Sequence, residues 1–228
     1  MTKIRDKLQI IGVEIKKYAK QYQRDPDDIQ LLAVSKRHPV GAIQTAFDAG
    51  QQSFGENYVQ ELAEKAHALS ELDISWHFIG PLQSNKTKQI AEIASWVHTI
   101  DRFKIAQRLN DQRPEGLPPL SICIQINISG EVSKSGVSVD ELEELASKVA
   151  KLPHLRLRGL MIIPAPSDSF EEQRATFAKV SKIKDQLNQQ GYRLDTLSMG
   201  MSGDMKAAIA EGATIVRIGT AIFGARDV

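Results

Sequence analysis

Two hydrophobic patterns alternate along the chain. Short apolar runs without polar alternation are typical of strands that are buried on both faces, as in a parallel sheet. Between these runs, apolar residues recur at steps of three and four, which is the period of an amphipathic helix. In the first helical stretch the apolar face consists of Ile4, Leu8, Ile11, Ile15 and Tyr18. The predicted strands are residues 29–35, 52–56, 75–80, 96–100, 120–128, 155–163, 194–200 and 214–219.

Three later helices are predicted from their starting residues. One begins near Pro39, because proline is favoured in the first turn of a helix. A second begins at Ser138, which forms an S-x-x-E capping box with Glu141, and a third begins near Ser169. Eight strands, each followed by a helical segment, favour closure into a parallel barrel over an open sheet. The sequence therefore predicts one α/β domain over residues 1–228, a (β/α)8 TIM barrel with an extra N-terminal helix.

Composition narrows the class of protein. The chain is 42% hydrophobic and 25% charged, which is ordinary for a soluble globular protein, and its formal net charge is +1. Such a balance gives no global field that would recruit nucleic acid or acidic lipid. The N-terminus lacks the apolar core of a secretory signal, and no segment reaches the ~20 apolar residues that span a bilayer. The single cysteine, Cys123, lies in an apolar run and is predicted to be a buried thiol in a reducing compartment. We expect a cytoplasmic protein.

The turns after the seventh and eighth predicted strands contain a candidate anion site. In (β/α)8 barrels the active site lies at the C-terminal ends of the strands, and phosphate is commonly bound after strands 7 and 8. Backbone amides of Ser202, Gly203, Gly219 and Thr220, with the two hydroxyls, could converge on an anion there. The alternative is that the glycines only supply positive φ. Two such turns at these two positions favour a phosphate site.

A lysine and an arginine complete this candidate site. Closure of the barrel would place the first strand, which ends at Lys36, beside the eighth strand, which contains Arg217. A lysine near a phosphate site could hold pyridoxal 5'-phosphate (PLP) as a Schiff base. Its amine must lose a proton before it attacks the aldehyde, and desolvation and a nearby cation both lower the pKa of a lysine. An arginine that faces the pyridine nitrogen can only donate a hydrogen bond, so that nitrogen would stay unprotonated. The ring would then be a weaker electron sink. The alternatives are a surface lysine and a structural arginine paired with a carboxylate.

Other motifs are weaker. The segment SGEVSKSG lacks the G-K-[ST] ending of a phosphate-binding P-loop, and we interpret it as a loop after the fifth strand, with Lys134 over the site. His77 and His98 lie near the ends of successive strands but lack an H-E-x-x-H motif and a carboxylate partner. We therefore interpret them as hydrogen-bonded core histidines and predict no metal site.

Seven motifs spread along the chain are LLAVSK, FGENYVQE, WHFIGPLQSNK, INISGEVSKSG, RGLMIIP, LSMGMSGDM and VRIGTAIFGAR. Together they resemble the pyridoxal phosphate homeostasis proteins, which are relatives of the alanine racemase barrel. The resemblance extends from the leading helix to Arg226 and implies a PLP barrel of fold type III with the cofactor on Lys36. Some relatives carry a second lysine where this chain has His38. The other implied contacts are Asn57 beside the cofactor, Arg217 at the ring nitrogen, and Met201, Ser202, Gly219 and Thr220 in the phosphate-binding turns.

The resemblance also implies a function. It implies a PLP-binding protein that maintains the balance of vitamin B6 vitamers without catalytic turnover, with B6 vitamers and PLP-dependent apoenzymes as partners, and we expect a monomer. Alanine racemases add a C-terminal β-domain that contributes a catalytic tyrosine from a second subunit. The chain ends at Val228, soon after the eighth strand, so we expect that domain to be absent. The alternatives are a PLP-dependent amino acid racemase or lyase and, more distantly, a Schiff-base aldolase without cofactor.

Overall fold

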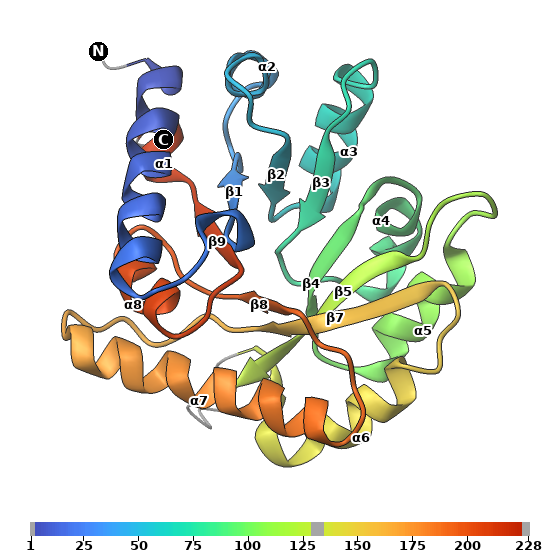
Figure 1. Ribbon diagram of the computed structural model, residues 1–228. Coiled ribbons are helices and arrows are strands. Elements are labelled where there is room, and N and C mark those ends of the chain that lie inside the picture. Colours follow the sequence, from blue (N-terminus) through green and yellow to red (C-terminus); the bar gives the residue numbers. More distant parts are fainter. Residues whose placement is uncertain (1–2, 129–134, 225–228) are drawn as a thin grey trace.

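The strands form a closed parallel barrel (Figure 1). The structure, a computed structural model, describes residues 3–128 and 135–224. The ring runs in the order β1-β2-β3-β4-β5-β7-β8-β9, and pairing of β9 with β1 closes it. Its strands are β1 (Gln30–Val34), β2 (Ser53–Glu56), β3 (Ser75–Phe78), β4 (Trp96–Ile100), β5 (Leu120–Asn127), β7 (Leu155–Met161), β8 (Thr196–Ser198) and β9 (Ile215–Ile218). The predicted (β/α)8 barrel and all eight predicted strands are confirmed.

One short strand was not predicted. β6 (Val137–Ser138) pairs with the end of β5 outside the ring. It comes directly before the predicted helix start at Ser138, whose hydroxyl accepts the Glu141 backbone N–H at 3.3 Å. Two residues are too few to produce a hydrophobic pattern of their own, which explains why the sequence did not indicate this strand.

Helices follow the strands and cover the outside of the barrel (Figure 1). The helices predicted near Pro39, Ser138 and Ser169 are α2, α6 and α7, and each starts one residue after that position. The helices are α1 (Ile4–Gln21), α2 (Val40–Asp48), α3 (Val59–Ala68), α4 (Thr87–Ile93), α5 (Phe103–Gln112), α6 (Val139–Val149), α7 (Phe170–Gln189), α8 (Met205–Ala210) and α9 (Thr220–Phe223), with 3-10 turns η1 (Pro26–Asp28) and η2 (Ser84–Lys86). No helix in the described ranges is long and apolar enough to span a membrane.

The leading helix α1 packs against α8, α2 and α9. It lies on the outside of the barrel (Figure 1). It buries Ile11, Ile15 and Ala19, as the three- and four-residue spacing predicts. After the helix, the Arg24 guanidinium donates to the backbone oxygens of Ile209 and Ala213, at the C-terminal end of α8. The N-terminal segment is therefore fixed to α8 and to the turn that precedes β9.

Two distinct cores result from the barrel. The larger lies between strands and helices and includes the fully buried Phe54, Phe78 and Phe177. A small second cluster contains Leu32, Val34, Ile79 and Ile215. These four alternate along their strands with the outward-facing residues, so they fill the inside of the ring.

Cys123 is buried, as predicted. Burial raises the pKa of its thiol to about 12, so the sulfur is protonated and unreactive at neutral pH.

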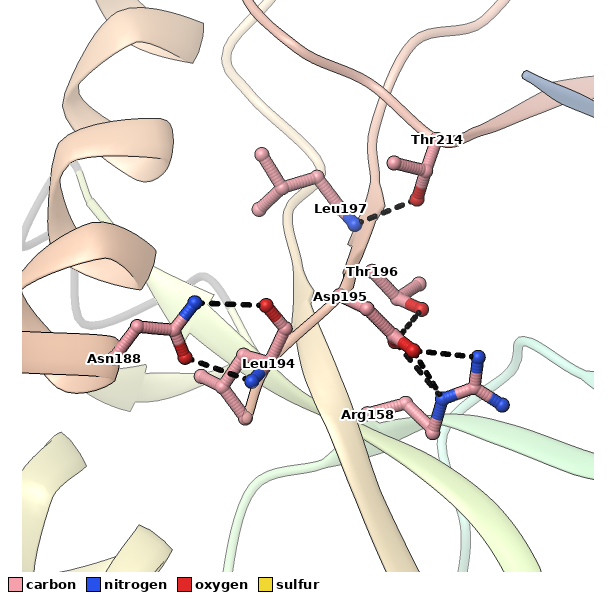
Figure 2. Close-up of polar contacts among 7 residues, drawn as sticks. All are labelled: Arg158, Asn188, Leu194, Asp195, Thr196, Leu197 and Thr214. Atoms are coloured by element: carbon pink, nitrogen blue, oxygen red, sulfur yellow. Dashed lines mark hydrogen bonds and ion pairs between the residues drawn. The ribbon is translucent and has the colours of Figure 1, made fainter. Parts of the chain in front are cut away.

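Side chains support the shortest ring strand, β8 (Figure 2). Before β8, the Asn188 amide accepts the Leu194 N–H at 2.7 Å and donates to the Leu194 carbonyl at 2.9 Å. Within β8, the Leu197 N–H donates to the Thr214 hydroxyl at 2.9 Å. These bonds supply partners to backbone groups that so short a strand leaves unpaired, and they hold β8 and the segment before it in place.

Candidate functional site

A cavity of about 300 Å³ opens at the C-terminal ends of the strands. Its lining includes all the described residues that the sequence singled out for the site: Lys36, Asn57, Met201, Ser202, Gly203, Arg217, Gly219 and Thr220. His38 also lines it, and Val34, Ile79 and Ile163 form apolar walls. The barrel thus brings together residues from both ends of the chain in one cavity.

The closure of the ring explains why Lys36 and Arg217 lie in the same cavity. β1 and β9 pair in parallel, with Leu32 opposite Arg217. Lys36 follows β1 by two residues and is half-buried, while Arg217 lies within β9 and is 5% exposed. The predicted proximity of these two strands is confirmed.

A buried ion pair holds the backbone before Lys36. Lys65 of α3 donates to Glu56 Oε1 at 2.7 Å and to the Ser35 carbonyl at 2.8 Å. The Ser35 hydroxyl donates to the same Glu56 oxygen at 2.6 Å. Glu56 is fully buried, and this burial raises the pKa of its carboxyl, although the Lys65 ammonium opposes the shift. We call Glu56 and Lys65 the clamp, because together they fix the residue that precedes Lys36.

The backbone after Lys36 is held as well. The Arg37 N–H donates to Glu61 Oε1 at 2.5 Å, and the same oxygen accepts from Lys65 Nζ at 2.7 Å. Arg37 has φ +61°, a left-handed conformation that is uncommon outside glycine, asparagine and aspartate. Helix α3 therefore holds Lys36 from both sides, in a turn that needs such support.

Arg217 has neutral partners. One terminal nitrogen donates to the Ser198 hydroxyl and the other to the Ile162 carbonyl, both at 2.9 Å. Burial lowers the pKa of Arg217 to about 10, which still leaves it a cation at neutral pH. Within the described ranges no carboxylate pairs with it, so the alternative of a carboxylate-paired structural arginine does not hold.

The two glycine turns differ in their backbone geometry. Gly200 has φ +96°, so the first turn does need glycine for its conformation. Gly219 has φ −116°, and a Cβ there would lie 3.0 Å from the Val34 carbonyl oxygen. Gly219 is thus needed for close approach to β1. It caps α9, and the first amides of that helix, at Thr220 and Ala221, have no acceptor within it.

Asn57 and Met201 contribute differently to the cavity. The Asn57 side-chain oxygen is buried and has no hydrogen-bond partner in the described ranges. A buried amide oxygen without a partner, in a residue that lines a cavity, can accept a hydrogen bond from a ligand. Met201 is 40% exposed, and its backbone N–H donates to Asp204 Oδ1 at 2.5 Å, which fixes the turn that presents Ser202.

His77 and His98 are core histidines, as interpreted from the sequence. Both are fully buried, and His77 Nδ1 lies 2.9 Å from His98 Nε2. His98 Nδ1 lies 2.7 Å from the Ser198 hydroxyl, which connects the pair to Arg217.

Sequence reasoning missed the apolar walls and the clamp. Val34 could have been found, because it lies two residues before Lys36 and so shares its side of the strand. Lys65 gave no such signal, since its spacing of four from Glu61 is typical of an exposed helical ion pair. Lys134 lies outside the described residues, so its predicted position over the site is not tested.

Comparison with known proteins gives a consistent result. Residues 14–227 match the family described as alanine racemase, N-terminal domain. The pyridoxal phosphate homeostasis protein of Pseudomonas aeruginosa is 53% identical over 227 residues, which cover 100% of this chain and 97% of that protein.

Solved structures agree. PipY from Synechococcus elongatus, solved with PLP bound, superimposes with a TM-score of 0.84 at 36% identity and covers 97% of this chain and 100% of its own. An alanine racemase from Corynebacterium glutamicum superimposes with a TM-score of 0.73 at 18% identity, over 97% of this chain and 62% of its own, and so shares the fold.

Proposed function

The chain belongs to the alanine racemase N-terminal domain family and, within it, to the pyridoxal phosphate homeostasis proteins, and from this premise we propose that it binds PLP in the cavity at the barrel mouth and serves the intracellular homeostasis of B6 vitamers. The observation that carries the proposal is the convergence of Lys36, Arg217 and the two glycine turns on one cavity. We further propose that residues 1–228 act as a single cytoplasmic, monomeric barrel domain.

Three features of the cavity fit PLP. The buried Asn57 oxygen lacks a partner in the described ranges, so a polar ligand would satisfy it. The Gly219 backbone leaves room that a Cβ would fill, beside the first amides of α9. The cavity lining contains Lys36 and Arg217 but no carboxylate among the described residues, which suits a ligand that carries a phosphate dianion.

Each residue has a distinct task in this proposal. When bound, PLP supplies an aldehyde that an amine can attack and a ring that withdraws electrons. Lys36 would form the covalent link, because the clamp and Glu61 fix its backbone at one place in the cavity. Arg217 would donate to the ring nitrogen and Asn57 would lie beside the ring. The phosphate would bind to Ser202, Gly219 and Thr220, with Met201 in the same turn.

We propose a carrier or regulator without catalytic turnover. Racemisation requires a proton acceptor on each face of the reacting carbon. The titratable residues among the described lining are Lys36, His38 and Arg217, and Arg217 is fixed as a donor. His38 stacks on Phe223, with ring centroids 5.1 Å apart. Since this described lining has no tyrosine or carboxylate, His38 is the one candidate base besides Lys36, and we propose that its ring serves to pack on Phe223; B6 vitamers and PLP-dependent apoenzymes are then the partners of the carrier.

The covalent link can be tested directly. Purified protein incubated with PLP and reduced with borohydride should carry a pyridoxyl group on the peptide that contains Lys36. Lys36→Ala should lose this label and retain weaker PLP binding, because the phosphate contacts remain. Lys88→Ala, an exposed lysine on α4, is the control and should label normally. A label that maps mainly to another lysine would show that Lys36 is not the acceptor.

A second experiment separates carrier from enzyme. We expect no appreciable exchange of the Cα hydrogen when PLP-loaded protein is incubated in heavy water with a panel of amino acids. Exchange with many turnovers that disappears in Lys36→Ala would establish a PLP-dependent racemase or lyase instead. Failure of the protein to bind PLP at all would refute the proposed function as a whole.

A further inference from the structure

A row of polar side chains crosses the inside of the barrel from the cavity to the opposite end. Arg217 on β9 donates to the Ser198 hydroxyl on β8 at 2.9 Å. Ser198 Oγ lies 2.7 Å from His98 Nδ1 on β4, and His98 Nε2 lies 2.9 Å from His77 Nδ1 on β3. His77 Nε2 ends the row at the Ser75 hydroxyl, at 3.2 Å. Because β4 and β8 are not neighbours in the ring, the contact between His98 and Ser198 spans the interior.

The direction of these hydrogen bonds follows from Arg217. A guanidinium can only donate, so Ser198 Oγ must accept from it. Ser198 is fully buried, and its remaining partner in the described ranges is His98 Nδ1. If His98 Nδ1 carried a proton, the Ser198 hydroxyl hydrogen would be left without an acceptor in the core, which is costly. Ser198 therefore donates and His98 Nδ1 accepts.

The same reasoning fixes both imidazoles. With Nδ1 as acceptor, neutral His98 carries its proton on Nε2 and donates it to His77 Nδ1. His77 then carries its proton on Nε2 and donates it to Ser75. Both rings are fully buried, and Trp96 stacks on His77 with ring centroids 5.5 Å apart. Burial lowers the pKa of His77 to about 3, and the pKa of His98 is lowered by burial and then by His77 and Arg217.

We propose that Ser198, His98 and His77 form a one-directional hydrogen-bond relay, with both histidines neutral and protonated on Nε2, that positions Arg217 for a ligand in the cavity. These three are positioning residues, since the cavity lining includes Arg217 and none of them. Two Arg217 N–H groups are used by Ser198 and Ile162, and these bonds fix the plane of the guanidinium at the cavity. The role toward the ligand rests on the proposed function, whereas the proton positions do not.

Nitrogen NMR of the ligand-free protein tests the proton positions. In wild-type protein, His77 and His98 should each show a protonated Nε2 and an unprotonated Nδ1, unchanged between pH 5.5 and 8. A coupling across the hydrogen bond should connect His98 Nε2 with His77 Nδ1. Protonation of either ring on Nδ1, or titration of either ring in this range, would overturn the relay, whether or not the protein binds PLP.

Substitution of Ser198 tests the positioning role. The probe is pyridoxine 5'-phosphate, which has an alcohol in place of the aldehyde and so cannot bond covalently to Lys36. In Ser198→Ala its Kd should rise about tenfold, equivalent to about 1.4 kcal/mol, and His98 should lose its single tautomer.

Ser53→Ala removes a buried hydroxyl at the start of β2 that accepts from Gln30, and its Kd should match the wild type. Equal Kd values for Ser198→Ala and Ser53→Ala would refute the positioning role. If the wild type fails to bind the probe and PLP, the proposed function fails, and the NMR result still decides the relay.

Discussion

Replacement of Lys65 by methionine should destabilise the barrel in a strongly pH-dependent way. Lys65→Met keeps most of the side-chain volume but removes the ammonium that donates to Glu56 and to the Ser35 carbonyl. Glu56 is fully buried, and its second oxygen already lacks a partner in the described ranges. The variant therefore leaves a buried carboxylate without a counter-ion.

The magnitude follows from two limits. Removing one partner of a buried ion pair costs about 3–5 kcal/mol. Glu56 can avoid the full cost by taking up a proton. Protonation of a carboxyl with the ordinary pKa of 4.5 costs about 1.4 kcal/mol for each pH unit above that pKa, which is about 4 kcal/mol at pH 7.5 but only about 1.4 kcal/mol at pH 5.5. The native-state pKa of Glu56 is raised above the unfolded value, so its contribution to stability is present at low pH and is lost as pH rises. The loss relative to wild type should thus shrink by up to about 2.7 kcal/mol between these pH values.

Urea unfolding of wild type and variant at both pH values measures this difference. Glu56→Gln/Lys65→Met removes both charges and should recover most of the loss. Lys148→Met breaks the exposed pair of Glu144 and Lys148, which has the four-residue spacing of Glu61 and Lys65, and should have a far smaller effect that does not follow this pH dependence. A Lys65→Met variant as stable as Lys148→Met, or equally destabilised at both pH values, would show that the clamp does not hold the site.

Three further results are expected. Gly219→Val should raise the Kd for PLP more than Ser202→Ala, because a Cβ at 219 meets the Val34 carbonyl oxygen at 3.0 Å; equal Kd values in an absorbance titration would contradict this. Pyridoxal should bind at least about 10-fold more weakly than PLP, since a charge-assisted hydrogen bond contributes about 1.5–3 kcal/mol, and equal Kd values would rule out the phosphate site. As pH falls below 6.5, the pKa of histidine in the unfolded chain, the free energy of unfolding should fall by up to about 1.4 kcal/mol per pH unit for each of His77 and His98. The reason is that only the unfolded chain takes up protons at these two residues. Urea melts that show no such slope would refute their burial in the neutral form.

The sequence was a reliable guide where local pattern and general rules of the fold suffice. The eight apolar runs predicted the ring strands, and the position of Lys36 after the first run placed it at the barrel mouth. The turns around Ser202 and Gly219 were found because barrels commonly bind phosphate at these positions. The reason for glycine at 219 was not accessible, since it depends on the distance to Val34 on another strand.

The polar interior could not be predicted, because its contacts join distant parts of the chain. His77 and His98 are 21 residues apart, and His98 and Ser198 are 100 residues apart. Each residue alone is unremarkable, and only the closed ring brings them within hydrogen-bond distance. Lys65 shows the same limit, since its four-residue spacing from Glu61 is typical of an exposed pair and gives no sign of its buried partner, Glu56 on β2.

The closed ring also determines when during synthesis the site can exist. Lys36 and Asn57 leave the ribosome early, whereas Ser202, Arg217 and Thr220 come from the last strands. A chain that still lacks β8 and everything after it contains the lysine but neither the arginine nor either glycine turn. Tight ligand binding therefore distinguishes finished barrels from nascent or truncated ones, and it stabilises only the finished ones by mass action. Cellular ligand supply would in this way act as a selective stabiliser of correctly closed molecules.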